Sequence, residues 1–326
     1  MEKTLVTGAN GFIGAALTRR LVRDGVAVRA MCRSAERGKA IAQAGAEVVQ
    51  GDVRDAALLK HYAEGCDVVF HVAAVGSGDW NTQYSINVEG TRNTIEAALQ
   101  ADVRRYVHVS SIAVYGYEIY GRIDENYPQR PPQYDYYMRT KSAGESLVWE
   151  IAGQSGLQAV SVRPAFVYGP GSTTWARALY DTCRRFGYIL PAGGRGNAHP
   201  IYVDDVVDLL VTVATHPAAP GNAFHSAPDP AITWREFLGY YARMAKRTRE
   251  RIIPIPPPII LKPVASALTL LLQLRGQNND VYGAIRFLTR NATYSMDRAR
   301  SLLGWQPRVS LDEGMALTEK WLKQTT

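Results

Sequence analysis

The stretch TGANGFIG at residues 7–14 places three glycines three residues apart, directly after a short apolar run at residues 4–7. Apolar residues recur at helical spacing after it, so the stretch predicts a strand, a tight turn and a helix. At such a junction one glycine adopts backbone angles closed to other residues, a second lets a pyrophosphate approach the main chain, and a third lets helix and strand pack closely. A lone glycine-rich turn is also common, so the motif leaves a dinucleotide site and an ordinary turn as alternatives.

Strand-like runs alternate with helical stretches up to about residue 165. The runs are almost continuously apolar and lie near residues 26–32, 46–50, 67–73, 105–110 and 157–163. This alternation predicts an α/β fold with a Rossmann-type, doubly wound parallel sheet that helices cover on both faces. We expect residues 1–168, with a returning segment at about 200–225, to form a dinucleotide-binding domain. Residues 169–199 and 226–326 are expected to form a smaller, mostly helical substrate-binding lobe.

Composition narrows the class of protein. The 326 residues are 46% apolar and 21% charged, which is typical of a soluble globular protein. The net charge is +7, but no basic block is interleaved with aromatic residues, so an anionic cofactor or a membrane surface is a better expectation than nucleic acid. The three cysteines have no CxxC spacing, which argues against a disulfide framework or a zinc site and favours the cytoplasm. The chain enters a strand at once, so we expect no signal peptide.

Two short segments carry residue types suited to proton transfer. Tyr137 and Lys141 lie four residues apart in a helical run, so a phenol and an ammonium share one helix face. A nearby positive charge lowers the pKa of a tyrosine, although such pairs are also frequent on solvated helices. Ser110 and Ser111 follow a predicted parallel strand, at the edge of the sheet where ligands bind in α/β folds. These serines could equally cap the turn that follows them.

Six motifs occur in one order, and together they are more specific than any one of them. They are TGANGFIG, HVAA at 71–74, NVEGTRN at 87–93, SSIAVYG at 110–116, YMRTK at 137–141 and RPAFVYGPG at 163–171. This series resembles the extended short-chain dehydrogenase/reductase family, also called the NAD-dependent epimerase/dehydratase family. The resemblance continues to LGWQPRVSLDEG at 303–314, so it covers nearly the whole chain.

The resemblance implies a role for each matching residue. Tyr137 would be the catalytic acid/base, Lys141 would lower its pKa and hold the nicotinamide ribose, and Ser111 would hydrogen-bond the reacting oxygen. Asn87 would help to complete a proton relay, with a helix cap as the alternative. No metal is implied. The residues implied to bind the cofactor are Gly8, Asn10, Gly11, Phe12, Ile13, Gly14, Asp52, Val53, Ala73, Ala74, Tyr137, Lys141, Pro164 and Val167.

The end of the second strand decides which dinucleotide is expected. An NAD site usually carries an acid about 20 residues beyond the glycines, whereas an arginine accommodates the 2′-phosphate of NADP. Cys32 occupies the position of the acid, and Arg33 and Ser34 follow it. Arg33 offers a bidentate fork, with Arg37 or Lys39 as additional cations, so we expect NADP(H) to be preferred over NAD(H). A solvated basic helix start is the alternative.

The resemblance spans several activities. Dehydratases of the family carry an acidic pair next to the serine, where this chain has Ile112 and Ala113, so dehydration is not expected. We expect an oxidoreductase that interconverts a ketone and a secondary alcohol on a fairly apolar small molecule, close in character to the hydroxysteroid dehydrogenase-like and dihydroflavonol reductase-like branches. A sugar-nucleotide epimerase of the same family is the alternative. A non-catalytic NADP(H) sensor is the second alternative, although a sensor would not need to keep Ser111, Tyr137 and Lys141 together.

The second lobe contains an apolar segment at residues 252–274, which is interrupted by prolines and Lys262. These breaks argue against a membrane-spanning helix, so a buried helix is the leading expectation. Five cations lie just before it at residues 243–251, and a basic segment beside an apolar one can also settle on an anionic membrane. Residues 243–274 are therefore a candidate peripheral membrane contact, and the resemblance also implies a homodimer. The aromatic and basic candidates for the substrate pocket are Trp80, Tyr84, Phe166, Tyr168, Trp175 and Arg177, each of which could instead serve lobe packing.

Overall fold

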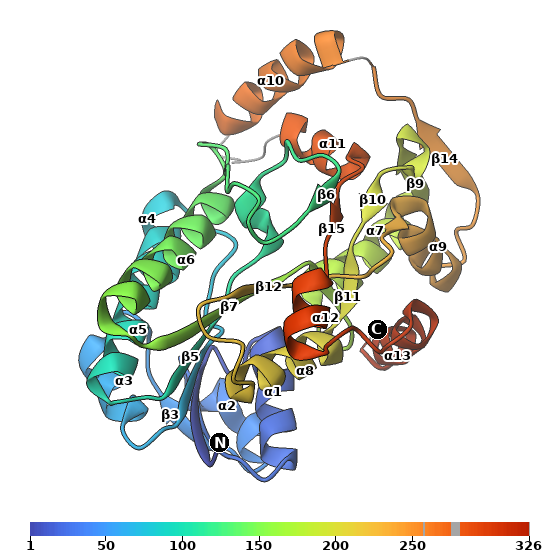
Figure 1. The fold of residues 1–326 in the computed structure, drawn as a ribbon. Helices are drawn as coiled ribbons and strands as arrows, with labels where there is room; N and C mark the ends of the chain where they lie inside the picture. The colour runs from blue at the N-terminus through green and yellow to red at the C-terminus, as the bar shows by residue number, and fades with distance from the viewer. Residues whose placement is uncertain (257, 275–280, 326) are drawn as a thin grey trace.

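A computed structural model describes residues 1–256, 258–274 and 281–325 of the chain. Seven parallel strands form its central sheet, in the order β12-β7-β5-β4-β1-β2-β3 (Figure 1). Residues 257, 275–280 and 326 of the expected substrate-binding lobe lie outside the described residues. The strands are β1 (Lys3–Thr7), β2 (Ala27–Cys32), β3 (Glu47–Gln50), β4 (Val68–His71), β5 (Arg105–Val109), β7 (Gln158–Pro164) and β12 (Ala223–Ser226). The Rossmann-type sheet expected from the sequence is confirmed.

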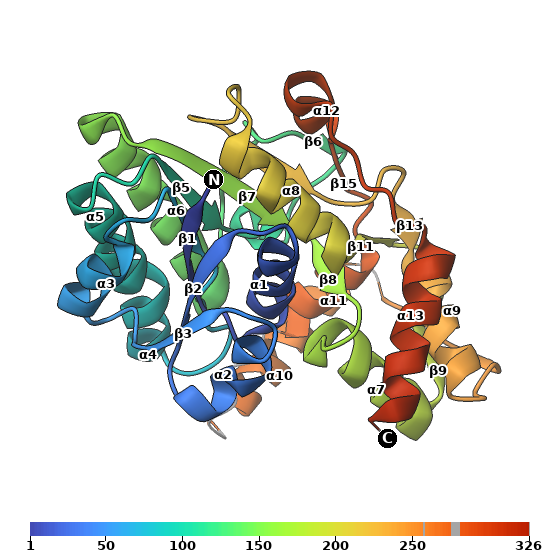
Figure 2. The same ribbon diagram turned by 90° about the horizontal axis from the view of Figure 1, so that it is seen from below.

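Helices cover the sheet on both faces (Figure 2). One face carries α1 (Phe12–Arg23), α2 (Ala35–Ala42) and α8 (Val203–Thr215), and the other carries α3 (Ala56–Ala63), α5 (Gly90–Gln100) and α6 (Tyr136–Ser155). Neighbouring residues of a strand point to opposite faces, so Leu5 packs into the core beneath α3, α5 and α6, while Val6 packs into the core beneath α1 and α8. Both side chains are fully buried, which explains the nearly continuous apolar character of the strands.

The strand order changes direction at β1. This strand pairs with β2 on one side and with β4 on the other. The loops that leave the carboxyl ends of β1 and β4 therefore separate, and a crevice opens at this edge of the sheet. The glycine-rich turn follows β1 and the HVAA motif ends β4, so both face this crevice.

The segment near residues 200–226 returns to the main sheet. Strand β11 (Pro200–Tyr202) pairs with β8 (Phe166–Tyr168), helix α8 follows, and β12 then pairs with β7 at the edge of the sheet. These two strands and the helix between them span the returning segment that the sequence predicted at about 200–225. How the chain divides into two domains stays a prediction, because one hydrophobic core continues from Val6 to Trp234 in the second lobe.

The second lobe is mostly helical, and short strand pairs that the sequence did not indicate lie within it or join it to the segment after β5. The pairs are β6 with β15, β9 with β14, and β10 with β13. Their bounds are β6 (Arg122–Ile123), β9 (Tyr188–Pro191), β10 (Asn197–Ala198), β13 (Ile232–Thr233), β14 (Glu250–Ile253) and β15 (Thr293–Tyr294). The remaining helices are α4 (Trp80–Tyr84), α7 (Leu179–Phe186), α9 (Trp234–Met244), α10 (Pro258–Leu274), α11 (Val281–Thr289), α12 (Asp297–Leu303) and α13 (Leu311–Gln324).

The expectation of a buried helix at residues 252–274 is wrong. Ile252 and Ile253 belong to β14, and the helix begins only at Pro258. Helix α10 packs against α11 at the edge of the molecule, away from the main sheet (Figure 1). Leu261 and Ala265 are buried, but Val264 is 63% exposed and Leu271 is 56% exposed. Among the residues that the structure describes, α11 covers one face of α10, and apolar residues of the opposite face are in contact with solvent.

Helix α6 closely approaches the turn between α4 and α5 at Gly144. A Cβ atom added to Gly144 would lie 2.6 Å from the backbone oxygen of Asn87, which is closer than two such atoms can pack. Asn87 belongs to a π-helical turn at Ser85–Glu89, between α4 and α5. The missing side chain at Gly144 therefore sets how close α6 lies to this turn.

We expect Gly144→Ala to destabilise the fold by about 1–3 kcal/mol, because the added methyl group forces α6 away from Asn87. Gly153 is the matched control, since it lies on the same helix with nothing within 4 Å of an added Cβ. Gly153→Ala should raise the free energy of unfolding by about 0.5–1 kcal/mol through helix propensity. Urea unfolding of both variants checks the pair, and equal stabilities would contradict the close approach.

Candidate active site

The glycine-rich turn leaves room for a ligand at the start of α1. Gly8 has φ +67°, and a Cβ added to it would lie 2.8 Å from the backbone of Ala73. A Cβ on Gly14 would lie 2.2 Å from the backbone oxygen of Gly8, so this glycine permits the close packing of helix and strand. Gly11 is exposed and precedes α1 with no side-chain cap, which leaves the N–H groups of the first helical turn directed at the crevice. These residues fit the pyrophosphate of a dinucleotide.

Two cavities meet at this crevice. The first, of about 580 Å³, extends from the glycine-rich turn to the ends of β2 and β3, and the second, of about 800 Å³, extends toward the second lobe. Phe12, Ile13, Ala74 and Tyr137 line both cavities, so the two are continuous. The predicted cofactor residues that line the first cavity are Gly8, Asn10, Gly11, Phe12, Ile13, Gly14, Arg33, Asp52, Val53, Ala73, Ala74 and Tyr137. Lys141, Pro164 and Val167 line the second.

The far end of the first cavity is basic. Arg33 and Arg37 line it, while Lys39 forms an ion pair with Glu36 at 2.5 Å. The Ser34 hydroxyl accepts a hydrogen bond from the backbone of Arg37 and thus caps α2 instead of lining the cavity. Asp52 is the carboxylate there, and Arg54 holds it through two bonds of 2.8 Å. Arg54, with a smaller contribution from Arg33, holds the pKa of this carboxyl below its usual value.

Ser111 is fixed where β5 turns into a short 3₁₀ helix at Ile112–Tyr115. Its Oγ accepts a hydrogen bond of 3.1 Å from the backbone N–H of Ala113, so the serine caps this helix. The hydroxyl keeps its proton for donation, and the same side chain hydrogen-bonds Tyr137. Ser111 thus caps this helix and lies beside Tyr137, and its hydrogen bond to a reacting oxygen stays a prediction. Ser110 points elsewhere and donates to Glu145 at 2.7 Å.

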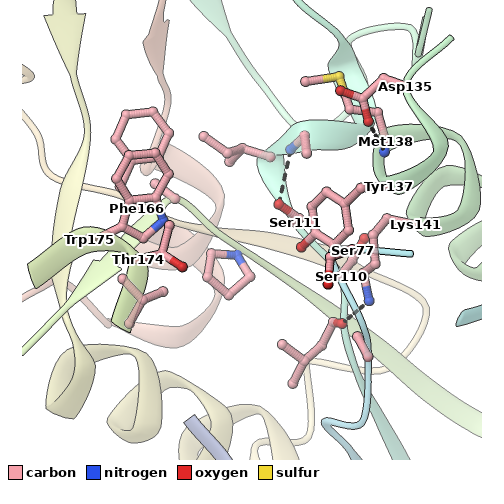
Figure 3. A pocket seen from close by; sticks show the side chains of 18 of the residues that line it. Ser77, Ser110, Ser111, Asp135, Tyr137, Met138, Lys141, Phe166, Thr174 and Trp175 are labelled. Atoms are coloured by element: carbon pink, nitrogen blue, oxygen red, sulfur yellow. Dashed lines mark hydrogen bonds between the residues drawn. The ribbon is translucent and has the colours of Figure 1, made fainter. Parts of the chain in front are cut away.

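Tyr137 and Lys141 are presented by the first turns of α6. Asp135 begins this helix, because its carboxylate accepts from the backbone N–H of Met138 at 2.9 Å. Tyr137 faces the cavity beside Ser111 (Figure 3). The buried Lys141 ammonium donates to the backbone oxygen of Val109 at 2.6 Å. The side chains of Ser111, Tyr137 and Lys141 therefore meet at the carboxyl end of β5, as the resemblance implied.

Burial has the largest effect on the pKa values of Tyr137 and Lys141. Burial raises the pKa of Tyr137, the hydrogen bond with Ser111 lowers it, and the Asp135 carboxylate raises it again. Burial also lowers the pKa of Lys141 to about 8, against the opposing effect of Glu145. The groups that shift the pKa of Tyr137 here are the surrounding protein, Ser111 and Asp135, so the depression of this pKa by Lys141 stays a prediction. The raised pKa keeps Tyr137 protonated at neutral pH.

Asn87 is buried, and protein groups occupy its amide. The oxygen accepts from the backbone N–H of Val75 at 2.9 Å, and the nitrogen donates to the Val75 oxygen at 2.9 Å and to the Thr140 hydroxyl at 3.0 Å. The side chain joins the loop after β4 to α6 and is not a helix cap. Its role in a proton relay stays a prediction.

Aromatic side chains form the wall of the second cavity opposite Ser111 and Tyr137 (Figure 3). The rings of Phe166 and Trp175 stack with centroids 4.5 Å apart, and Phe287 lies 4.9 Å from Phe166. Phe166 and Trp175 were among the sequence candidates, whereas Trp80, Tyr84, Tyr168 and Arg177 are absent from the described lining. The sequence reasoning missed Ser77, Thr174, Ala284, Phe287 and Arg290, which also line the cavity. No spacing signal marks them, because they come from loops, from a π-helical turn at Thr173–Ala178 and from α11.

A buried ion pair lies beneath these residues. Arg163 on β7 and Glu145 on α6 approach to 2.8 Å, with side chains 5% and 0% exposed. Arg163 also donates to the backbone oxygen of Glu125 at 2.8 Å and to the hydroxyl of Tyr115. These bonds join α6 to β7 and to the segment after β5, so they fix the height of α6 above the sheet.

Comparisons with known proteins find a family model, relatives and solved structures that are similar to this chain. Residues 4–225 match the model of the NAD-dependent epimerase/dehydratase family. A 4-hydroxy-2-methyl-3-oxo-4-farnesyl-3,4-dihydroquinoline-1-oxide ketoreductase of Stigmatella aurantiaca is 30% identical over 96% of this chain and 94% of its own length. A 3beta-hydroxysteroid-dehydrogenase/decarboxylase of Arabidopsis thaliana is 29% identical over 96% of this chain and 78% of its own. The structure of MoeE5 with UDP-glucuronic acid and NAD superposes with TM-score 0.78 at 25% identity, over 99% of this chain and all of the other.

Proposed function

From its membership of the NAD-dependent epimerase/dehydratase family, as an NAD(P)-dependent enzyme, we propose a reaction for this chain. It interconverts a ketone and a secondary alcohol on a fairly apolar small molecule, with NADP(H) as the preferred cofactor. The observation that carries the proposal is the junction of the two cavities. Ser111 and Tyr137 face a space whose opposite wall is formed by Phe166, Trp175 and Phe287. The ketoreductase and hydroxysteroid dehydrogenase relatives, by their names, act on substrates of similar apolar character.

Ser111, Tyr137 and Lys141 each have a different role in the proposed reaction. The bound nicotinamide supplies or accepts the hydride. Ser111 donates a hydrogen bond to the carbonyl oxygen of the substrate and holds it beside the phenol. Tyr137 gives its proton to that oxygen during reduction, and its raised pKa suits a proton donor at neutral pH. Lys141 carries its positive charge below about pH 8 and is placed to hold the ribose of the cofactor.

An epimerase acting on a sugar nucleotide is the runner-up, and the lining of the second cavity disfavours it. A nucleoside diphosphate carries two or more negative charges that need several cations. The charged side chains in the described lining of this cavity are Asp135, Lys141 and Arg290. Lys141 is already engaged with Val109. This cavity therefore suits an uncharged or singly charged molecule with a large apolar part.

We expect Tyr137→Phe to lower turnover by about 10²- to 10⁴-fold, because the variant loses the proton donor but keeps the ring. Its affinity for NADPH should change little. Ser111→Ala should cost less, since it removes one hydrogen bond and leaves the proton source in place. Loss of NADPH absorbance with a panel of steroid and alkyl ketones measures all three proteins. Undiminished turnover in folded, NADPH-saturated Tyr137→Phe would favour the non-catalytic sensor instead.

The preference for NADP(H) is proposed from the end of β2. An NAD site would place a carboxylate there, but Cys32 is buried and the exposed Arg33 follows it. Arg33 and Arg37 line this end of the first cavity and would hold the 2′-phosphate of NADP. Asp52 is held by Arg54, so it does not offer a free carboxylate to a ribose hydroxyl.

NADPH should therefore bind at least about 10-fold more tightly than NADH. Arg33→Ala should weaken NADPH binding by about 10- to 100-fold and NADH binding far less, because a charge-assisted bond to the 2′-phosphate is lost. Lys39→Ala is the matched control: it removes a cation from the same segment that pairs with Glu36 and does not line the cavity. Titration calorimetry gives the affinities. Equal binding of the two cofactors by the wild-type protein would contradict the proposal.

We also propose that the protein contacts anionic membranes through residues 243–274. Ile260, Val264, Leu268 and Leu271 are exposed and recur at helical spacing, so they form one apolar face of α10. The exposed cations just before this helix are Arg243, Lys246, Arg247, Arg249 and Arg251. None of the helices in the described part of the chain is long and apolar enough to span a membrane. An apolar face beside a cationic segment suits a helix that lies in the headgroup region.

The protein should sediment with vesicles of phosphatidylglycerol and phosphatidylcholine at low salt, and much less with pure phosphatidylcholine. High salt should release it, because screening shortens the reach of the cations to about 3 Å at 1 M. Leu268→Glu should abolish sedimentation, whereas Leu317→Glu, which alters an exposed leucine on α13, should not. Failure to sediment at low salt would refute the contact, and a dimer in sedimentation equilibrium that Leu268→Glu dissociates would assign the face to a second copy.

A further inference from the structure

Arg290 is a buried cation at the substrate cavity. It follows directly after α11, its residue is 4% exposed, and it lines the same 800 Å³ cavity as Ser111 and Tyr137. Its backbone oxygen accepts from the N–H of Asn197 at 2.8 Å, which fixes the position of the main chain. Burying a guanidinium is costly unless its charge and its donors are matched.

The partners of Arg290 leave its charge unmatched within the described residues. One terminal nitrogen donates to the backbone oxygen of Gly116 at 3.3 Å and the other donates to the hydroxyl of Tyr294 at 3.1 Å, both long bonds to neutral groups. The Nε atom is buried and has no partner among the residues that the structure describes. The guanidinium also lies 4.7 Å from the centre of the Phe287 ring.

Arg163, the other buried arginine at the site, has the carboxylate partner that Arg290 lacks among the described residues. Arg163 is equally buried, but the Glu145 carboxylate lies 2.8 Å from it. No described carboxylate takes this place at Arg290. Of the other charged groups that line the cavity, Asp135 caps α6 and accepts a hydrogen bond from Tyr117, and Lys141 donates to Val109. Arg290 is therefore the lining cation best placed to receive an anionic group of a ligand.

We propose that Arg290 binds a carboxylate of the substrate, so that the substrate is an apolar keto acid or hydroxy acid. This inference rests on the proposed function, because Ser111 and Tyr137 would receive the ketone or alcohol oxygen of the same molecule. A guanidinium matches the two oxygens of a carboxylate, and one arginine balances one negative charge. The aromatic wall of Phe166, Trp175 and Phe287 covers the apolar part.

Binding tests the carboxylate site without relying on turnover. Decanoate and 1-decanol have the same apolar chain and differ in the head group, and calorimetric titration into the NADP-loaded protein compares them. Decanoate should bind about 10- to 100-fold more tightly than 1-decanol. Arg290→Gln should remove most of this preference, and Arg290→Lys should keep part of it, because the charge remains while the planar fork is lost.

Arg286→Gln is the matched control. Arg286 lies one turn earlier on α11, does not line the cavity, and places its guanidinium beside Tyr120. Its substitution removes the same charge and should leave the preference for decanoate intact. Equal binding of decanoate and 1-decanol by the wild-type protein would overturn the proposal, as would equal losses for both probes in Arg290→Gln, which would make the arginine a packing element only.

Oxidation of 3-hydroxydecanoate and of its methyl ester with NADP⁺ then separates this inference from the proposed function. The acid should have the higher kcat/KM, and in Arg290→Gln the advantage should shrink mainly through a higher KM for the acid. If decanoate binds as expected but neither alcohol, nor any ketone of the panel, is turned over, the carboxylate site stands and the proposed reaction fails. If both alcohols react equally well and the two decyl probes bind equally, the reaction stands and the carboxylate site fails.

Discussion

The buried ion pair between Glu145 and Arg163 holds the site together. It joins α6 to β7 in a place from which water is excluded, and removing either partner would leave an uncompensated charge that costs about 3–5 kcal/mol. Ser110 and Tyr115 add bonds from the segment that carries Ser111. The helix that presents Tyr137 and the loop that presents Ser111 are thus fixed to the same two charged side chains. The relative position of serine and tyrosine follows from this arrangement, and so does the depth at which Lys141 is buried.

Charge and burial divide the residues of the site into two groups. Arg163 and Glu145 satisfy each other and serve the fold, whereas Arg33 and Arg290 face cavities without a carboxylate partner in the described structure. The first arginine lies at the end of the cavity that suits a dinucleotide, and the second lies in the cavity lined by aromatic rings. A ligand can neutralise the charge of Arg33 or Arg290, because no described carboxylate of the protein does.

Much of the fold and part of the site could be predicted from the sequence. The glycine-rich turn, the apolar strands and the positions of Ser111, Tyr137 and Lys141 follow from local patterns that the structure preserves. The sequence left two alternatives for residues 258–274, a buried helix and an exposed one, because apolar residues do not reveal how many elements cover a helix. The lowered pKa of Lys141 depends on its depth, which no spacing reveals. Arg290 has no local motif either, and the absence of acidic residues from 286–295 is only a faint sign of its unmatched charge.

The hydrophobic core that runs from Val6 beneath α1 and α8 to Trp234 in the second lobe has a thermodynamic consequence. Neither part of the chain encloses this core alone, so each stabilises the other, and the molecule should lose its structure in one cooperative step. A large-to-small substitution at Trp234 would leave a cavity and would destabilise the sheet as well as the second lobe. Residues 1–168, separated from the rest, would expose the apolar surface of β8 and of the strand edge that β12 covers. The sheet therefore depends on the distant end of the chain for its solubility as much as for its ligand.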